Sequence, residues 1–173
     1  MTPEHFRTLA RYNAWANRHL YDACAALSDA EFRKPRQAFF GSILGTLNHV
    51  LVADRVWLGR LEGVPSGIAA LDQILYGDLA DLAAARTAED ARITALVDGY
   101  GAGELGRDLV YRTMAGTEHR TPVVWVLSHL FNHQTHHRGQ AHGLLSQTAV
   151  PPPPLDLIYF LREREADVTA DRA

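Results

Sequence analysis

Four stretches of the chain repeat apolar side chains every three or four residues, the spacing of a helix that buries one face. The first opens with Thr2 and Pro3, and the last opens with Thr121 and Pro122. In each pair a helix N-cap residue precedes a proline that suits the first helical turn. The pattern predicts an all-α, four-helix bundle. The four helices are expected to span residues 2–27, 42–62, 78–98 and 121–146.

Shorter elements are expected between and after the long helices. A capping-box pattern at 28–31 predicts a short turn of helix, and alternating side chains at 109–121 predict a small β-hairpin before the last long helix. A short amphipathic piece is expected at 155–165. We expect residues 1–166 to form a single domain, and residues 167–173 to form a frayed tail.

Each long helix carries polar residues in the middle of its apolar stripe. An unpaired polar group in a core costs about 1–3 kcal/mol, so these residues are expected to meet in a polar cavity inside the bundle. The second helix looks the most buried, with a narrow wet strip that includes Asn48. The mid-stripe residues are Asn13, Asp54, Arg86 with Glu89, and His133 with His137.

Composition excludes several classes of function. The net charge of −3, from 17 basic and 20 acidic residues, argues against a nucleic-acid partner. The sequence contains no uninterrupted apolar stretch long enough to span a bilayer, so no membrane association is expected. A single cysteine, Cys24, and no recognisable signal peptide favour a cytoplasmic location; Cys24 itself is interpreted as a small buried hydrophobe.

Histidine is the unusual residue type, with five of the nine histidines between residues 129 and 142. His133 and His137 lie one helical turn apart, where Cβ atoms are about 5–6 Å apart and two imidazoles can bind one cation. His49, on the second helix, is the candidate third ligand. The apolar stripe of the last long helix is traced as Val123, Val126, Leu130, His133, His137, Ala141 and Leu144.

The spacing of these histidines leaves alternatives open. His129 and His133 form a second pair at the same spacing. Buried histidines can also be ordinary core residues, here hydrogen-bonded to Asn13, Asp54 or Glu89 without any metal. Spacing alone does not choose between these interpretations.

Conspicuous motifs occur in three of the long helices: YNAWAN at 12–17, GTLNHV at 45–50 followed by ADRVW at 53–57, and HLFNHQTHHRGQ at 129–140. Together they resemble the DinB-like metal-dependent proteins of the DinB/YfiT superfamily over nearly the whole chain. The resemblance implies that His49, His133 and His137 are the metal ligands. The Arg-Gly-Gln sequence that follows His137 marks it as the second ligand of the helix, which leaves His129, His136 and His142 as non-ligands.

The same resemblance implies an up-down-down-up bundle, a homodimer and one divalent metal ion, zinc or nickel. Characterised relatives include enzymes that use low-molecular-weight thiols, as S-transferases or as a thiol-dependent isomerase, while many members have no known reaction. The resemblance therefore suggests a thiol S-transferase that acts on an electrophilic small molecule. A metal-dependent hydrolase and a non-catalytic metal-binding stress or damage-response protein are the alternatives, since fold relatives need not share chemistry.

Four charged residues are candidate catalytic groups around such an ion. Asp54 or Glu89 is a candidate proton acceptor, and Arg86 or Arg138 is a candidate binder of an anionic group. Each has a structural alternative: a core ion pair between Arg86 and Glu89, and a solvated helix face for Arg138. Aromatic residues Trp15, Trp57 and Trp125 are assigned to packing in the core or in a dimer.

Overall fold

The computed structural model describes residues 1–170, which contain helices and one antiparallel hairpin. The last three residues of the expected frayed tail lie outside the described residues, and the fraying stays a prediction. In chain order the elements are α1 (Pro3–Cys24), α2 (Asp29–Arg33), α3 (Ile43–Glu62), α4 (Leu79–Asp98), α5 (Ala102–Gly106), β1 (Asp108–Arg112), β2 (Glu118–Pro122), α6 (Val123–Leu145) and α7 (Leu157–Ala170).

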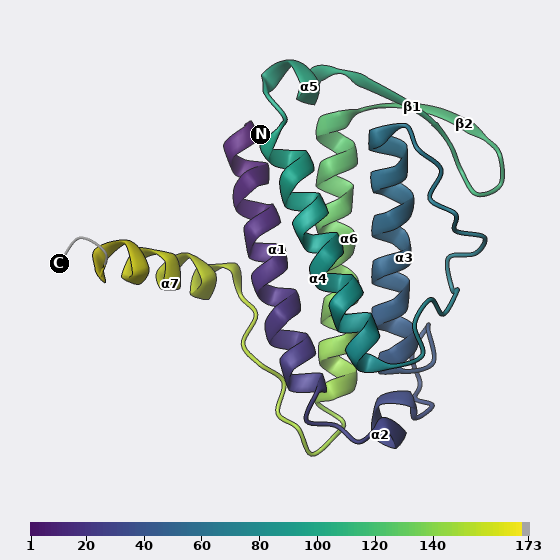
Figure 1. The fold of residues 1–173 in the computed structure, drawn as a ribbon, viewed down its shortest axis with the longest axis vertical. Coiled ribbons are helices and arrows are strands. Elements are labelled where there is room, and N and C mark those ends of the chain that lie inside the picture. The colour runs from purple at the N-terminus through teal and green to yellow at the C-terminus, as the bar shows by residue number, and fades with distance from the viewer. Residues whose placement is uncertain (171–173) are drawn as a thin grey trace.

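Helices α1, α3, α4 and α6 form the predicted four-helix bundle (Figure 1). Helix α1 packs against α4 and α6, and α3 packs against the same two helices from the other side. The chain runs in one direction along α1 and α6 and in the opposite direction along α3 and α4 (Figure 1). This is the up-down-down-up order. Because α3 and α4 are parallel neighbours, the chain needs a long connection from the end of α3 to the start of α4, and residues 63–78 return along the outer side of α3 (Figure 1).

The ends of the helices follow the sequence signals, with two corrections. Helix α1 ends at Cys24, before the predicted residue 27. Beyond Cys24 the backbone hydrogen bonds reach three residues back instead of four, as in the bond from Leu27 N to the Cys24 carbonyl. Helix α6 begins after Pro122, one residue later than predicted, because Thr121 is paired with Leu109 in the hairpin. At the end of α3, Gly63 adopts a φ of 72°, the left-handed conformation that terminates a helix.

The predicted hairpin is confirmed as strands β1 and β2, joined by a turn in which Gly116 has a φ of 86°. Helix α5 was not predicted, because it begins inside the glycine cluster at 99–103 that was interpreted only as a helix end. Helix α7 starts two residues later than expected and continues to Ala170, so the first four residues of the expected tail are helical.

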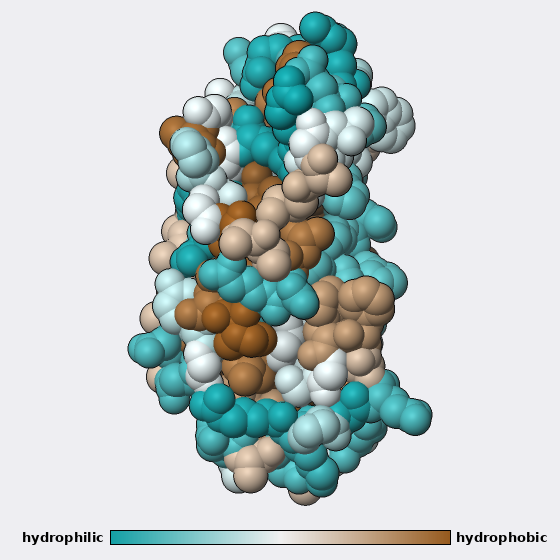
Figure 2. All heavy atoms as spheres, turned by 90° about the vertical axis from the view of Figure 1, so that its right-hand side faces the viewer, coloured by the Kyte–Doolittle hydropathy of each residue, from teal (hydrophilic) through white to brown (hydrophobic). Residues whose placement is uncertain are grey.

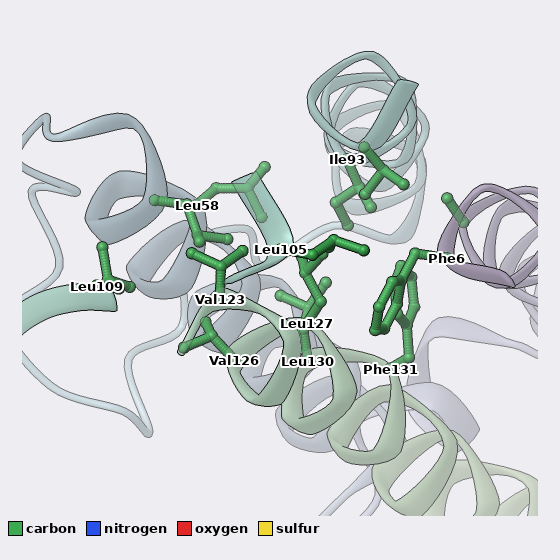
Figure 3. Close-up of a cluster of buried hydrophobic side chains, with 13 residues drawn as sticks. Phe6, Leu58, Ile93, Leu105, Leu109, Val123, Val126, Leu127, Leu130 and Phe131 are labelled. Atoms are coloured by element: carbon green, nitrogen blue, oxygen red, sulfur yellow. The ribbon is translucent and has the colours of Figure 1, made fainter. Parts of the chain in front are cut away.

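Two apolar clusters fill the bundle, one toward each end. Figure 3 shows the cluster near the hairpin, where Phe6 of α1, Leu58 of α3 and Ile93 of α4 converge with side chains of α6. The other cluster lies near α2 and includes Leu20, Leu51 and further residues of α6. Among residues 1–170, no helix has an apolar stretch long enough to cross a membrane.

Candidate metal centre

His49, His133 and His137 come together between α3 and α6. One ring nitrogen of each lies within 4.8 Å of the corresponding nitrogens of the other two. The Nε2 atoms of His49 and His133 are 3.2 Å apart, and the His133 and His137 ring centroids are 4.2 Å apart. The structure therefore brings together the three predicted ligands.

The spacing of these nitrogens suits a cation. A tetrahedral ion with metal–nitrogen bonds of about 2.0–2.1 Å holds its ligand atoms about 3.3–3.4 Å apart. The separation of 3.2 Å between the His49 and His133 Nε2 atoms is close to that value. A shared proton would satisfy only these two nitrogens, whereas a metal ion would also use the third. No carboxylate joins the cluster within the described part of the chain.

Neighbouring oxygens fix which ring nitrogens are free to bind a metal. The Nδ1 atom of His49 lies 2.8 Å from the Leu71 carbonyl, which can only accept a hydrogen bond, so Nδ1 donates and Nε2 keeps its lone pair. The Nδ1 atom of His137 lies 2.8 Å from Oε1 of Gln140, which leaves its Nε2 free in the same way. Such second partners orient metal-binding imidazoles and set their tautomer.

Burial keeps all three imidazoles neutral, the form that binds metals. Burial, together with the adjacent His137 and His49, lowers the pKa of His133 to about 3. Burial also lowers the pKa of His49 and of His137, although the hydrogen bonds to Leu71 and Gln140 oppose the effect. Near neutral pH each of the three imidazoles is therefore neutral and offers a ring-nitrogen lone pair to a metal ion.

Two residues that the sequence did not single out shape the centre. Phe40 stacks on His49 with ring centroids 3.8 Å apart, and its ring also meets the His137 ring edge-on. Its backbone can approach α3 because residue 45 is glycine: a Cβ there would lie 2.1 Å from the Phe40 carbonyl oxygen. Gly45 was quoted in the family motif, but the loop residue Phe40 had no periodic signal.

Asn48 is the second missed residue, and its assignment to a wet strip was wrong. It is fully buried, and its amide bonds the backbone of the 63–78 connection at Leu75 and Tyr76. These bonds hold the connection that carries the Leu71 carbonyl to His49. The available signal was the one side-chain amide in the helix that the sequence indicates to be the most buried.

A pocket of about 480 Å³ adjoins the histidine cluster on the side of His49 and His133. Its wall includes His49, His133 and Trp57, and the hairpin and the 63–78 connection complete it. Figure 2 shows this face of the molecule, where apolar side chains gather between hydrophilic ends. Exposed apolar residues of the connection and hairpin are Val64, Leu71, Ile74, Val110 and Met114. A small molecule with an apolar part can therefore lie beside the centre.

The predicted apolar stripe of α6 is confirmed at Val123, Val126, Leu130, Ala141 and Leu144, and it is corrected by one position in its middle. His133 and His137 are half-buried at its edge, whereas Gln134 and Arg138 occupy the buried centre, at 0% and 3% exposure. Successive residues on a helix point about 100° apart, so a stripe traced by spacing alone can shift by one residue. The expectation of a solvated Arg138 was wrong for the same reason.

The mid-stripe polar residues form a network of their own, between the two apolar clusters and apart from the histidines. Arg86 lies 2.5 Å from Asp54 and 3.0 Å from Asp90, and Gln134 also donates to Asp54. The predicted pairing of Arg86 with Glu89 was wrong; Glu89 pairs instead with Arg residues nearer the surface. We call this set the buried polar network: Asn13, Asn17, Asp54, Arg86, Asp90, Gln134 and Arg138.

The network engages three of the four candidate catalytic residues, Asp54, Arg86 and Arg138. Arg138 donates to the side-chain oxygen of Asn13 at 2.7 Å, and Asn13 in turn donates to Asp90 at 3.0 Å. Burial raises the pKa of Asp54 while Arg86 opposes that rise. No hydrogen bond or ion pair described for residues 1–170 joins Asp54, Arg86 or Arg138 to the three histidines. The single polar cavity expected from the sequence was therefore wrong: the histidine cluster and the buried polar network are two separate sites.

The other histidines and tryptophans have different contacts. His129 packs edge-on against Trp57 in the pocket wall, and His142 bonds the Pro153 carbonyl at 3.0 Å. Trp15 is buried against α7, as a packing role predicts. Trp125 is 59% exposed, so it is not a core residue.

Native Cys24 is expected to resist 5,5′-dithiobis(2-nitrobenzoate) at pH 8. The side chain is 0% exposed, and burial raises its pKa to about 12, so the reactive thiolate is scarce until the pH approaches that value. Absorbance of the released thiol is the measurement. The unfolded chain should release one equivalent at once; rapid release from the folded protein would contradict the buried position.

Comparison with known proteins agrees with the fold and the motifs. The model of the DinB family matches residues 1–168. The chain is 25% identical to protein DinB of Bacillus subtilis, over 88% of this chain and 91% of that protein. It superposes on the crystal structure of a DinB-like protein from Bacillus cereus with a TM-score of 0.70 and 20% identity, over 88% of this chain and 97% of the other. With its four-helix bundle and three clustered histidines, the chain belongs to the DinB family.

Proposed function

We propose that the chain binds one divalent metal ion, zinc or nickel, through His49, His133 and His137, and transfers a small thiol to an electrophilic substrate. The observation that carries the proposal is the convergence of three neutral imidazoles on one point, with two of their Nδ1 atoms already engaged. Bound there, an ion with only three protein ligands keeps a position open and lowers the pKa of a thiol or water.

The chain's own residues supply binding and orientation. Leu71 and Gln140 hold the imidazoles, and the Phe40 ring covers His49 and limits access of water to it. The adjoining pocket offers space for an organic substrate. In the transfer, the sulfur–hydrogen bond breaks and a sulfur–carbon bond forms. In a substitution the electrophile loses a leaving group as its anion and the thiol proton passes to water; in an addition an unsaturated electrophile takes up the proton.

One feature of the pocket favours a thiol over water as the nucleophile. The described residues that line it include histidines and an arginine but no carboxylate. Metal-assisted hydrolysis commonly relies on a carboxylate as general base, as in the HExxH metalloproteases. Asp54 and Glu89, which were predicted as proton acceptors, are paired with arginines elsewhere. Their catalytic role, that of Arg86 and Arg138, and the expected homodimer stay predictions.

Zinc-loaded protein is expected to speed the conjugation of glutathione or cysteine to 1-chloro-2,4-dinitrobenzene, measured by product absorbance. Chelation or His137→Ala should return the rate to that of the buffer. Cleavage of p-nitrophenyl acetate without thiol, at a rate that depends on the same histidine, would favour the hydrolase. The absence of activity with a broad panel of thiols and electrophiles would favour a non-catalytic metal-binding protein.

A further inference from the structure

Arg60 lies in the wall of the pocket that adjoins the histidine cluster at His49 and His133. It is on the same face of α3 as His49, three helical turns farther along. Its guanidinium stacks on Trp57 and on Tyr111 of the hairpin, with 4.4 Å and 4.9 Å to the ring centroids. One of its nitrogens, Nη2, donates to the Arg112 carbonyl at 2.9 Å. The group is thus held in place by both walls of the pocket.

This guanidinium is half-buried and has no acidic counterpart. Among the described residues no carboxylate lies within ion-pair distance of Arg60, whereas Arg55 and Arg92 pair with Glu89. Burial accordingly lowers the pKa of Arg60. Only one of its five N–H donors has a hydrogen-bond acceptor in the described structure. A fixed, desolvated guanidinium with free donors is a typical binder of carboxylate or sulfate groups.

The surroundings of Arg60 define the rest of the ligand. Trp57, Tyr111 and His129 present aromatic surface, and Met114 and Val56 add apolar surface. Flat apolar groups pack well on such walls. From His49 to Arg60 the backbone of α3 rises about 16 Å, so a ligand that reaches both ends must be extended.

We propose that Arg60 binds the anionic group of an extended organic acid whose flat, apolar body lies on Trp57 and Tyr111. The other end of this ligand points toward the three-histidine centre, a placement that rests on the proposed function. Arg60 is therefore a specificity residue: it selects ligands that carry an anionic group remote from the reacting atom.

The test compares two fluorescent probes that share an aromatic body. 8-Anilinonaphthalene-1-sulfonate carries an anionic group, and N-phenyl-1-naphthylamine does not. Arg60→Gln is expected to weaken binding of the sulfonate by about tenfold or more, the usual size of a lost charged hydrogen bond, and to leave the neutral probe within about twofold. Arg60→Lys should recover part of the loss. Arg120→Gln, which removes the same charge from an exposed hairpin position, should change neither.

Equal weakening of both probes would mean that Arg60 only anchors the hairpin, and unchanged sulfonate binding would mean that it binds no anion; either result overturns the proposal. The titrations are run on chelated protein, so they succeed or fail independently of metal binding.

With an active zinc-loaded protein, KM values for glutathione against its diethyl ester, and for 4-(bromomethyl)benzoate against its methyl ester, identify whether thiol or electrophile carries the anion. Equal Arg60→Gln effects within both pairs would also contradict the proposal.

Discussion

Replacing His133 with alanine is expected to abolish stoichiometric zinc binding, with a loss of affinity of about a hundredfold or more. Replacement of a residue that only orients a metal ligand already weakens metal binding by about 10–100-fold. His133 is proposed to bind the metal directly, with its Nε2 3.2 Å from Nε2 of His49. Competition with a chromophoric chelator measures the affinity. Zinc at about 100 times its Kd should stabilise the native protein by about 2.7 kcal/mol and raise Tm by about 5–10 °C. The variant should lose this rise.

His129→Ala is the matched control for that experiment. His129 and His137 are each four residues from His133, so the two variants separate the rival ligand pairs. The ring of His129 packs on Trp57 in the pocket wall, and its removal should leave zinc stoichiometry at one and affinity within about threefold. If His129→Ala loses zinc while His137→Ala retains it, the proposed ligand set is wrong.

Removal of the Asp54 carboxylate is expected to lower the free energy of unfolding by about 3–5 kcal/mol, the usual result of breaking a buried ion pair. Asp54→Ala leaves Arg86, which is 2% exposed, with one acidic neighbour fewer and removes the acceptor of Gln134. Urea denaturation at constant m measures the change. The free energy of unfolding of a typical protein is only about 5–15 kcal/mol, so the Asp54→Ala loss is a large part of it. Asp54→Asn, which keeps an acceptor for Gln134, is the milder companion variant.

Glu118→Ala provides the control, because Glu118 pairs with Arg112 at an exposed position. Its effect should lie within about 1 kcal/mol. If Asp54→Ala costs no more than this control, the network does not hold the bundle together. Folded Asp54→Asn should keep its zinc, and a selective loss of turnover in it would support the predicted role of Asp54 as proton acceptor.

The helices, the hairpin and the grouping of the histidines could be predicted because each depends on local signals. Thr2 with Pro3 and Gly63 mark helix ends by their own chemistry, and His133 and His137 are neighbours on any helix. His49 could be named as the candidate third ligand from its place on the second helix, but its assignment as a ligand needed the family motif, since spacing does not say which helices face one another. The 3.2 Å approach of its Nε2 to His133 depends on the packing of α3 on α6.

The remainder of the site depends on tertiary contacts that no periodicity records. Phe40 and Leu71 lie on connections without regular structure and reach His49 only after the chain has folded back. Arg60 meets Tyr111 only once the hairpin covers α3. The polar residues of the four stripes were recognised, but spacing could not resolve the single-residue difference that sends Gln134 into the network and His133 into the metal centre.

X-ray absorption spectroscopy of the zinc-loaded wild-type protein tests the metal centre most directly. The proposed site predicts one zinc ion per chain, with three imidazole nitrogens at about 2.0–2.1 Å and no sulfur at about 2.3 Å, since the only cysteine, Cys24, is buried and is not part of the cluster. Substoichiometric zinc that a weak chelator removes, or a bound ion with fewer than three imidazole donors, would contradict the three-histidine centre.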